Sequence, residues 1–211
     1  MGQYYNCLVK RGGVFHNYSL QVKGWKEKEK EGDTWAYNGV KLMEHSYWGN
    51  PFMVVLTGDL YHHKARVAWV GDYADDYNWE HPEDKPVPKA LHWLAWGGVK
   101  DQPVLQEEDI DADMGDITLE DKYLVNHTKR IYVDGNKYYD MNKFKWSEEG
   151  KYTCIHPLSL LTACGNGLGG GDYHEDNPDY WRVGEWCFDE ISVEDEPPVG
   201  YHEENYCFKE N

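Results

Sequence analysis

The sequence predicts an α+β fold built mainly from antiparallel β-sheet, with two or three short helices and long acidic loops. Stretches rich in Tyr, Val and Phe alternate with glycine and Asp-Gly turns, a pattern typical of hairpins. Two apolar stretches at helical spacing begin at prolines and predict the helices. No fixed-period repeat is present, so we expect one domain over residues 1–211. A weak internal boundary is expected near 99–120, where large apolar residues are few.

The first half should supply a hairpin, strands and a well-capped helix. Asn50 is a suitable N-cap, Pro51 fits the first helical position, and the apolar residues that follow share one helical face. Residues 65–71 (ARVAWVG) are β-branched and aromatic, as in a buried strand. The elements expected in order are a hairpin of residues 3–9 and 14–22, a strand over 35–42, a helix over 51–61, a strand over 65–71 and a helix over 89–96.

The second half should open with a meander. Strand-like runs over 122–142 are separated by a polar turn and by an Asp134-Gly135 pair, so we predict three antiparallel strands there. A second helix should begin at Pro157 with an apolar stripe of leucines. Gly165 should end that helix as its C′ residue, so the helix would run directly into a glycine cluster.

Five of the seven residues from Gly165 to Gly171 are glycine. Each ordered glycine costs roughly 0.5–1 kcal/mol relative to alanine, so the cluster indicates positive φ angles or close approach to a ligand or a second backbone. The glycines formally match a dinucleotide fingerprint, but the expected helix before them, where a strand is required, argues against it. Backbone amides in such a cluster can still form an anion-binding nest. The alternative is a tight structural crossing.

Two segments share the pattern G-D-Y-x-acid-D, at 71–76 and 171–176. If they meet in space, their acidic and aromatic side chains would form one pocket, able to hold a divalent cation or act as general acid and base. The alternative is that each Asp caps its own turn. The candidate ligand-binding residues are Gly167, Gly169, Gly170, Gly171, Asp172, Tyr173, Asp72 and Tyr73. In a catalytic version, the residues would be Asp72, Asp172 and His174.

Other motifs are weaker. The histidines show no H-E-x-x-H spacing, and the EF-hand-like run over 109–120 has its glycine at position seven instead of six. Cys164 is expected to be a core cysteine, the alternative being a nucleophile paired with His156 or His174. We therefore expect no cofactor and at most weak binding of a divalent cation.

Composition bounds the partners and the compartment. The chain carries 38 acidic and 21 basic residues, a net charge of −17, which argues against direct binding to a nucleic-acid backbone. No apolar run reaches the length of a membrane span, the N-terminus lacks signal-peptide features, and the five cysteines form no C-x-x-C pair. The expected location is therefore cytoplasmic, with no membrane partner.

The strings MGQYY, KLMEHSYWGNPF, VAWVGDYAD, KYLVNHTKRIYVD and IHPLSLLTACGNGLGGGDY, with the less specific ISVEDEPPVGY, resemble a family of small cytoplasmic proteins of bacteria and their phages. The resemblance implies one integrated domain and a prokaryotic or phage origin. It brings no catalytic residue with it. A phage origin would favour proteins that interfere with host machinery.

From these observations we expect a non-catalytic binding protein whose site lies at the glycine-rich loop and the two G-D-Y segments. Its partner would be a small molecule or nucleotide, or a basic host protein. The alternatives are a phage-encoded acidic inhibitor of a host defence or nucleic-acid-binding protein, and a metal-assisted hydrolase that uses paired Asp residues.

Overall fold

A computed structural model gives the arrangement of most of the chain. It describes residues 4–19, 46–74, 91–92, 94–95, 105–109, 117–145, 150–165 and 179–208.

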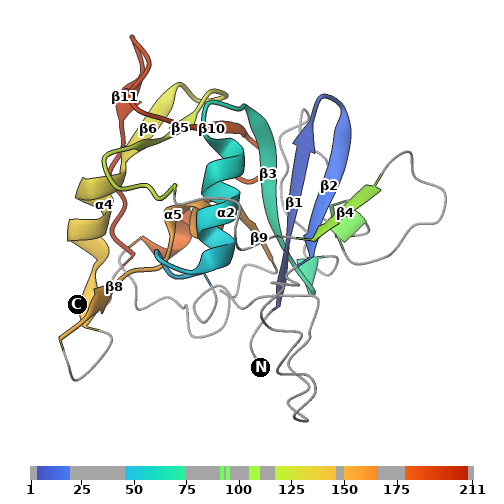
Figure 1. Cartoon of the computed structure of the whole chain (residues 1–211), viewed down its shortest axis with the longest axis horizontal. Coiled ribbons are helices and arrows are strands. Elements are labelled where there is room, and N and C mark those ends of the chain that lie inside the picture. The colour runs from blue at the N-terminus through green and yellow to red at the C-terminus, as the bar shows by residue number, and fades with distance from the viewer. Residues whose placement is uncertain are drawn as a thin grey trace.

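The described strands form one large mixed sheet and a small ribbon (Figure 1). The order along the sheet is β11-β6-β5-β10-β3-β1-β2-β4, and β9 pairs with β3. Five pairings are antiparallel, whereas β11–β6, β2–β4 and β3–β9 are parallel. The strands are β1 (Tyr5–Arg11), β2 (Val14–Ser19), β3 (Ala65–Gly71), β4 (Leu105–Asp109), β5 (Tyr123–Asn126), β6 (Ile131–Asp134), β9 (Ala163–Cys164), β10 (Glu190–Glu194) and β11 (His202–Glu203), and the ribbon pairs β7 (Phe144–Lys145) with β8 (Tyr152–Thr153).

The α+β expectation is therefore confirmed, as are the hairpin and the buried strand. Gly12 and Gly13 both have positive φ, which only glycine adopts readily, and they form the turn between β1 and β2. Of the helical stretch expected over 89–96, residues 91, 92, 94 and 95 are described and are helical. The strand expected over 35–42 lies outside the described residues.

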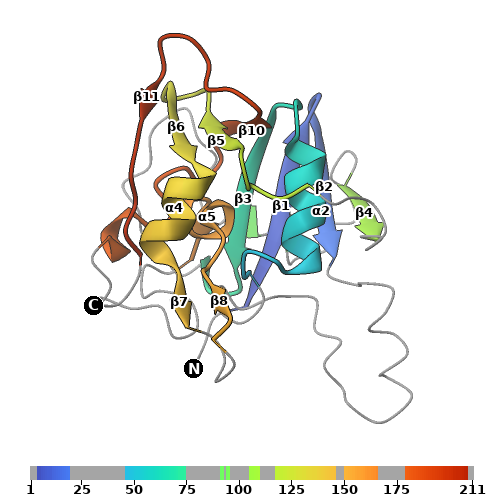
Figure 2. The ribbon, with the colours of Figure 1, turned by 60° about the vertical axis from the view of Figure 1, so that its left-hand side comes forward.

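The two proline-initiated helices begin where the sequence predicts. Helix α2 (Pro51–Leu60) is capped by Asn50, whose side chain accepts the backbone N–H of Phe52 at 2.9 Å. Helix α5 (Pro157–Leu161) is capped in the same way by His156. Figures 1 and 2 show α2 and α5 against the same face of the sheet.

The prediction of a third strand in the meander is wrong, because residues 135–142 form a helix. β5 and β6 pair as predicted, but Asp134 is the N-cap of helix α4 (Gly135–Asn142) instead of a turn residue, and its carboxylate accepts the N–H of Lys137 at 3.0 Å. Gly135 is required by a close approach, because a Cβ there would lie 2.0 Å from the Leu119 carbonyl oxygen. An Asp-Gly pair suits a hairpin turn and a helix start equally, and tertiary packing selects the helix.

The expected end of α5 is also wrong. The helix stops at Leu161, and Thr162 caps it, with its hydroxyl donating to the Leu158 carbonyl at 2.7 Å. Ala163 and Cys164 then form β9, so Gly165 is not the C′ residue and a short strand precedes the glycines. In the 99–120 region, where a weak internal boundary is expected, β4 pairs with β2, and most of the remainder lies outside the described residues.

Two apolar clusters lie on opposite faces of the sheet. The larger packs β1 and β3 against α2 and α5 and includes the fully buried Trp69 and Trp186. The smaller combines Leu8, Val70 and Cys164 with the helical residues at 91 and 95. Alternate residues of β1 and β3 therefore face different clusters, as the period of two along a strand requires.

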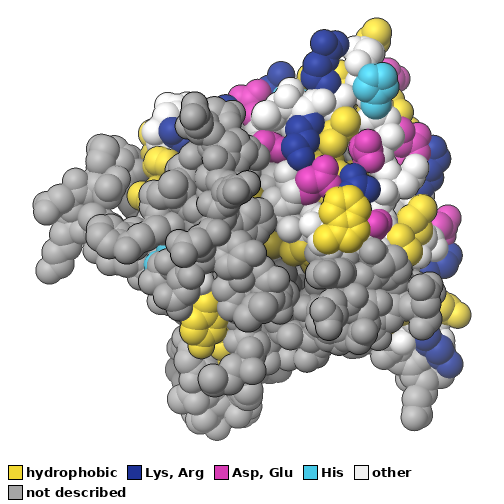
Figure 3. Space-filling view, turned by 180° about the vertical axis from the view of Figure 1, so that it is seen from behind, with side chains coloured by type: hydrophobic (Ala, Val, Ile, Leu, Met, Phe, Trp, Pro, Cys, Tyr) yellow, Lys and Arg dark blue, Asp and Glu magenta, His cyan; other side chains and the backbone are white. Residues whose placement is uncertain are grey.

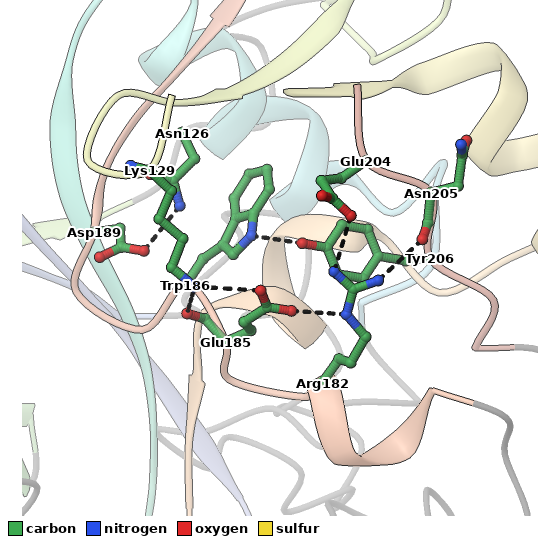
Figure 4. Close-up of polar contacts among 9 residues, drawn as sticks. All are labelled: Asn126, Lys129, Arg182, Glu185, Trp186, Asp189, Glu204, Asn205 and Tyr206. Atoms are coloured by element: carbon green, nitrogen blue, oxygen red, sulfur yellow. Dashed lines mark hydrogen bonds and ion pairs between the residues drawn. The ribbon is translucent and has the colours of Figure 1, made fainter. Parts of the chain in front are cut away.

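An arginine-centred cluster fixes the C-terminal segment (Figure 4). Arg182, in the 3₁₀ helix η3 (Tyr180–Arg182), donates to the carboxylates of Glu185 and Glu204 at 2.8 and 3.2 Å. Its guanidinium lies 3.8 Å from the ring centroid of Tyr206, whose hydroxyl accepts the indole N–H of Trp186. Because Arg182 joins groups up to 24 residues away, it ties residues 204–206 to η3.

The segment after η3 is held against α5. The backbone N–H of Gly184 donates to the Leu160 carbonyl at 2.8 Å. Beside it, the side chain of Asn126 donates to the buried carboxylate of Asp189 at 2.8 Å. Residues 166–178 therefore begin after β9 and return to a segment bonded to the helix that precedes β9.

Replacing Gly135 by alanine should destabilise the fold by about 3 kcal/mol or more, because the new methyl group would overlap the Leu119 carbonyl. The matched control is Gly49→Ala, where a Cβ meets no atom within 4 Å, and its effect should stay within about 0.5 kcal/mol. Urea unfolding of both variants measures the difference. Equal stabilities would contradict the close packing of α4 on residue 119.

His156 should make stability pH-dependent. The Thr57 hydroxyl donates to Met53, so Nε2 of His156 donates to Thr57, and Nδ1 accepts the N–H of Leu158. Complete burial lowers the pKa of His156 from 6.5 to about 3. Below pH 6.5 the His156 ring binds a proton in the unfolded chain but stays neutral in the folded chain. The free energy of unfolding is therefore retained above pH 6.5 and is lost as the pH falls from 6.5 towards 3.

The expected slope from this group is about 1.4 kcal/mol per pH unit in that range. His156→Asn keeps an N-cap acceptor and should remove that part of the slope, whereas His63→Asn, at an exposed position, should leave it unchanged. Chemical unfolding between pH 4 and 7 on the three proteins tests this. An unchanged slope in His156→Asn would refute the assignment.

Candidate binding site at the ends of β3 and β9

The parallel pairing of β3 with β9 brings two sequence-predicted segments together. Trp69 is in register with Ala163, and Val70 with Cys164. The next residue in each case is a glycine, Gly71 at the end of β3 and Gly165 directly after β9, so the two segments start side by side. In open sheets with parallel strands, ligands bind outside the carboxyl ends of the strands.

This arrangement places the first G-D-Y segment beside the start of the glycine cluster. Asp72 and Tyr73 are described, whereas the other predicted site residues lie outside the described residues: Gly167, Gly169, Gly170, Gly171, Asp172, Tyr173 and His174. Asp172 follows Gly165 by seven positions in the chain, an extended reach of about 24 Å. The geometry therefore permits the two segments to meet, and their meeting stays a prediction.

The structure removes one reason for excluding a dinucleotide fingerprint at the glycine cluster. A helix was expected directly before Gly165, where the fingerprint requires a strand, but strand β9 precedes Gly165. A fingerprint also needs a helix that begins within the glycines, and that part lies outside the described residues. A nucleotide therefore stays among the candidate ligands.

Asp72 is anchored through one carboxylate oxygen. Its backbone N–H donates to the Tyr4 carbonyl at 2.9 Å, and its Oδ1 accepts the Tyr4 N–H at 3.2 Å. Partial burial raises the pKa of Asp72, while the Tyr4 N–H opposes that rise. In the described part of the chain no Lys or Arg forms an ion pair with it. Tyr73 beside it is 38 % exposed.

Two buried acceptors lie near Asp72, on the side covered by the 91–95 helical stretch. His92 Nε2 lies 3.1 Å from the Asp72 carbonyl, so Nε2 donates and Nδ1 of the neutral ring is an acceptor. Asn6 is 5 % exposed and donates through Nδ2 to the Ala95 carbonyl at 3.0 Å, which makes its Oδ1 an acceptor. Among the residues that the structure describes, neither His92 Nδ1 nor Asn6 Oδ1 has a hydrogen-bond partner. The sequence analysis did not identify either residue, because only the β1–β3 register and the nearby helical turn bring them to the site.

Cys164 lies in the core beside the same strand end. It packs in the smaller cluster, on the face opposite α2 and α5, whereas His156 caps α5 and contacts Thr57 of α2. The structure therefore does not pair Cys164 with His156. The pKa of Tyr5 is raised by burial and further by the charges of Asp72 and Cys164, which places the three groups within electrostatic range.

A second polar cluster, missed by the sequence analysis, joins β5, β10 and α2. His127 lies 2.8 Å from the Ser192 hydroxyl and 3.1 Å from that of Tyr201. The buried Ser192 donates to Glu194 at 2.6 Å, and Glu194 in turn bonds His62 at 2.9 Å. Because the serine proton goes to the carboxylate, His127 donates to Ser192 and does not activate it. We assign this cluster a structural role in holding the turn before β11.

The comparisons with known proteins are negative: no family model matches the chain, and neither a curated protein nor a solved structure matches it. The resemblance to small bacterial and phage proteins therefore stays an expectation. Among the helices of the described residues, none has the length and apolar character needed to cross a membrane.

Divalent cations should bind at this site weakly at best, because Asp72 already uses one carboxylate oxygen to accept the Tyr4 N–H. Calorimetric titration with Mg²⁺, Mn²⁺ and Ca²⁺ checks this for the wild type and Asp72→Asn. Tight, stoichiometric binding that Asp72→Asn removes would contradict the expectation and would support the metal-assisted hydrolase that uses Asp72 and Asp172.

Proposed function

We propose that this chain is a non-catalytic binding protein of bacterial or phage origin, acting in the cytoplasm. Its site is formed by the glycine-rich segment and the two G-D-Y segments, at the carboxyl ends of β3 and β9. The partner is a small molecule or nucleotide, or a basic host protein. The observation that carries the proposal is the register of β3 with β9, which starts the first G-D-Y segment and the glycine cluster side by side.

The described residues on either side of the glycine-rich segment also support a role in binding. Residues 166–178 start from the paired β9 and return to a segment whose N–H groups, at Gly184 and Trp186, donate to α5 at 2.8 and 2.7 Å. A segment with both ends held by the core suits presentation of backbone groups to a ligand, since loops on rigid scaffolds commonly carry binding residues.

The second candidate is an acidic inhibitor of a host protein, favoured by the net charge of −17. Such a protein would present a continuous acidic or apolar face. On the described surface seen in Figure 3, acidic and basic side chains are interspersed with apolar ones. A local site therefore fits the described part of this face better than an extended acidic one.

The proposal predicts that Gly171→Val abolishes ligand binding while the melting temperature of the free protein changes by only a few degrees. The physical reason is that a side chain would fill space that the ligand needs. Thermal shift measurements with nucleoside monophosphates, inorganic phosphate and L-argininamide provide the readout, and Gly49→Ala is the control. A loss of several kcal/mol in stability, with an unchanged ligand response per folded molecule, would show a structural crossing and refute the site.

A further inference from the structure

The two buried side-chain atoms without a partner that lie near Asp72 are both hydrogen-bond acceptors. Asn6 Oδ1 and His92 Nδ1 are both buried acceptors without a partner, and the Nδ2 and Nε2 donors of the same side chains are used by carbonyls. A buried acceptor without a partner lowers the stability of the folded protein. Such groups are rare, and one explanation for them is a ligand that supplies the missing donor.

The charge of Asp72 also favours a cationic ligand. Asp72 uses Oδ1 to accept the Tyr4 N–H, and among the described residues no Lys or Arg forms an ion pair with it, although the charge of His92 acts on it. An anion would meet this carboxylate and two lone pairs, and would be repelled. A cation that carries several N–H groups would pair with the charge and satisfy the acceptors together.

We propose that this site recognises a guanidinium group, the planar cationic donor of an arginine side chain or of a small guanidino compound, and not a phosphate. The inference rests on the proposed function and names the ligand class of that site. A guanidinium is favoured over an ammonium because its five N–H groups, spread in a fixed plane, can bond several acceptors at once, and the acceptors here come from β1, the end of β3 and the helical residues near 92.

The raised pKa of Asp72 is consistent with this assignment. Partial burial disfavours its charged form in the free protein, and a bound cation would restore it. The acidic composition adds in the same direction, since a net charge of −17 attracts basic partners over longer range.

The test is a calorimetric and NMR titration of the full chain with three probes: L-argininamide, a capped Gly-Gly-Arg-Gly-Gly peptide and inorganic phosphate. We expect saturable millimolar binding of the two guanidinium probes, as for other small fragments, weakening as salt rises. Tighter binding of the peptide indicates a polypeptide partner, whereas equal binding indicates a small guanidino compound; both outcomes support the proposal.

Variants identify the residues. Asp72→Asn keeps an oxygen for the Tyr4 N–H and should weaken argininamide binding roughly tenfold or more. Asn6→Leu should weaken it as well, with folding checked by the melting temperature. Asp140→Asn removes the same charge from an exposed position on α4 and should leave affinity unchanged.

Three results overturn the inference: an unchanged affinity in Asp72→Asn, binding of phosphate in preference to argininamide, or no binding of either guanidinium probe. Phosphate binding that Gly171→Val removes would leave the proposed function standing while refuting the ligand class. If no probe binds and Gly171→Val affects stability alone, the proposed function fails too.

Discussion

The pairing of β3 on both of its edges is the constraint on which the rest of the structure depends. β3 bonds β1 along one edge, and β10 and β9 along the other, and six of its seven residues are buried. The Trp69 N–H donates to the Thr162 carbonyl at 2.8 Å, which fixes the end of α5 against the strand. Because β9 follows at once, the start of the glycine cluster can lie nowhere else than beside Gly71.

The same register determines the chemistry of the site. Alternate residues of β1 face opposite clusters, so Asn6 shares its face with Val70 and Cys164 and meets the 91–95 helical stretch, while Tyr5 faces α2. The site thus combines a strand end, a neighbouring strand and a helical turn. The side chains that carry its acceptors belong to strands and a helical turn. Such elements hold polar groups at fixed positions even when no ligand is bound.

Local signals predicted what local physics determines. Asn50 and Pro51 set the start of α2, Pro157 sets that of α5, and the glycine pair at 12 and 13 sets the first hairpin. The failures occur where a long-range contact decides between two locally acceptable structures. Asp134 and Gly135 suit a turn or a helix start, and the Leu119 carbonyl, 2.0 Å from a virtual Cβ, shows that the helix is packed against residue 119.

The site was predicted in part for the same reason. The repeated G-D-Y pattern identified Asp72, whose place at a strand end follows from the local sequence. Asn6 and His92 carry no motif, and only the register of β1 on β3 and the packing of a helical turn bring them together. The parallel β3–β9 pair is equally invisible to periodicity, because two residues are too few to show a period.

The most direct test of this account is the distance between the Asp72 and Asp172 carboxylates in an experimental structure of the full chain. The account predicts that they face one site, within about 12 Å of each other, a separation that one ligand with metal- or hydrogen-bond-length contacts can span. A larger separation, with the second G-D-Y segment leading away from the ends of β3 and β9, would contradict it.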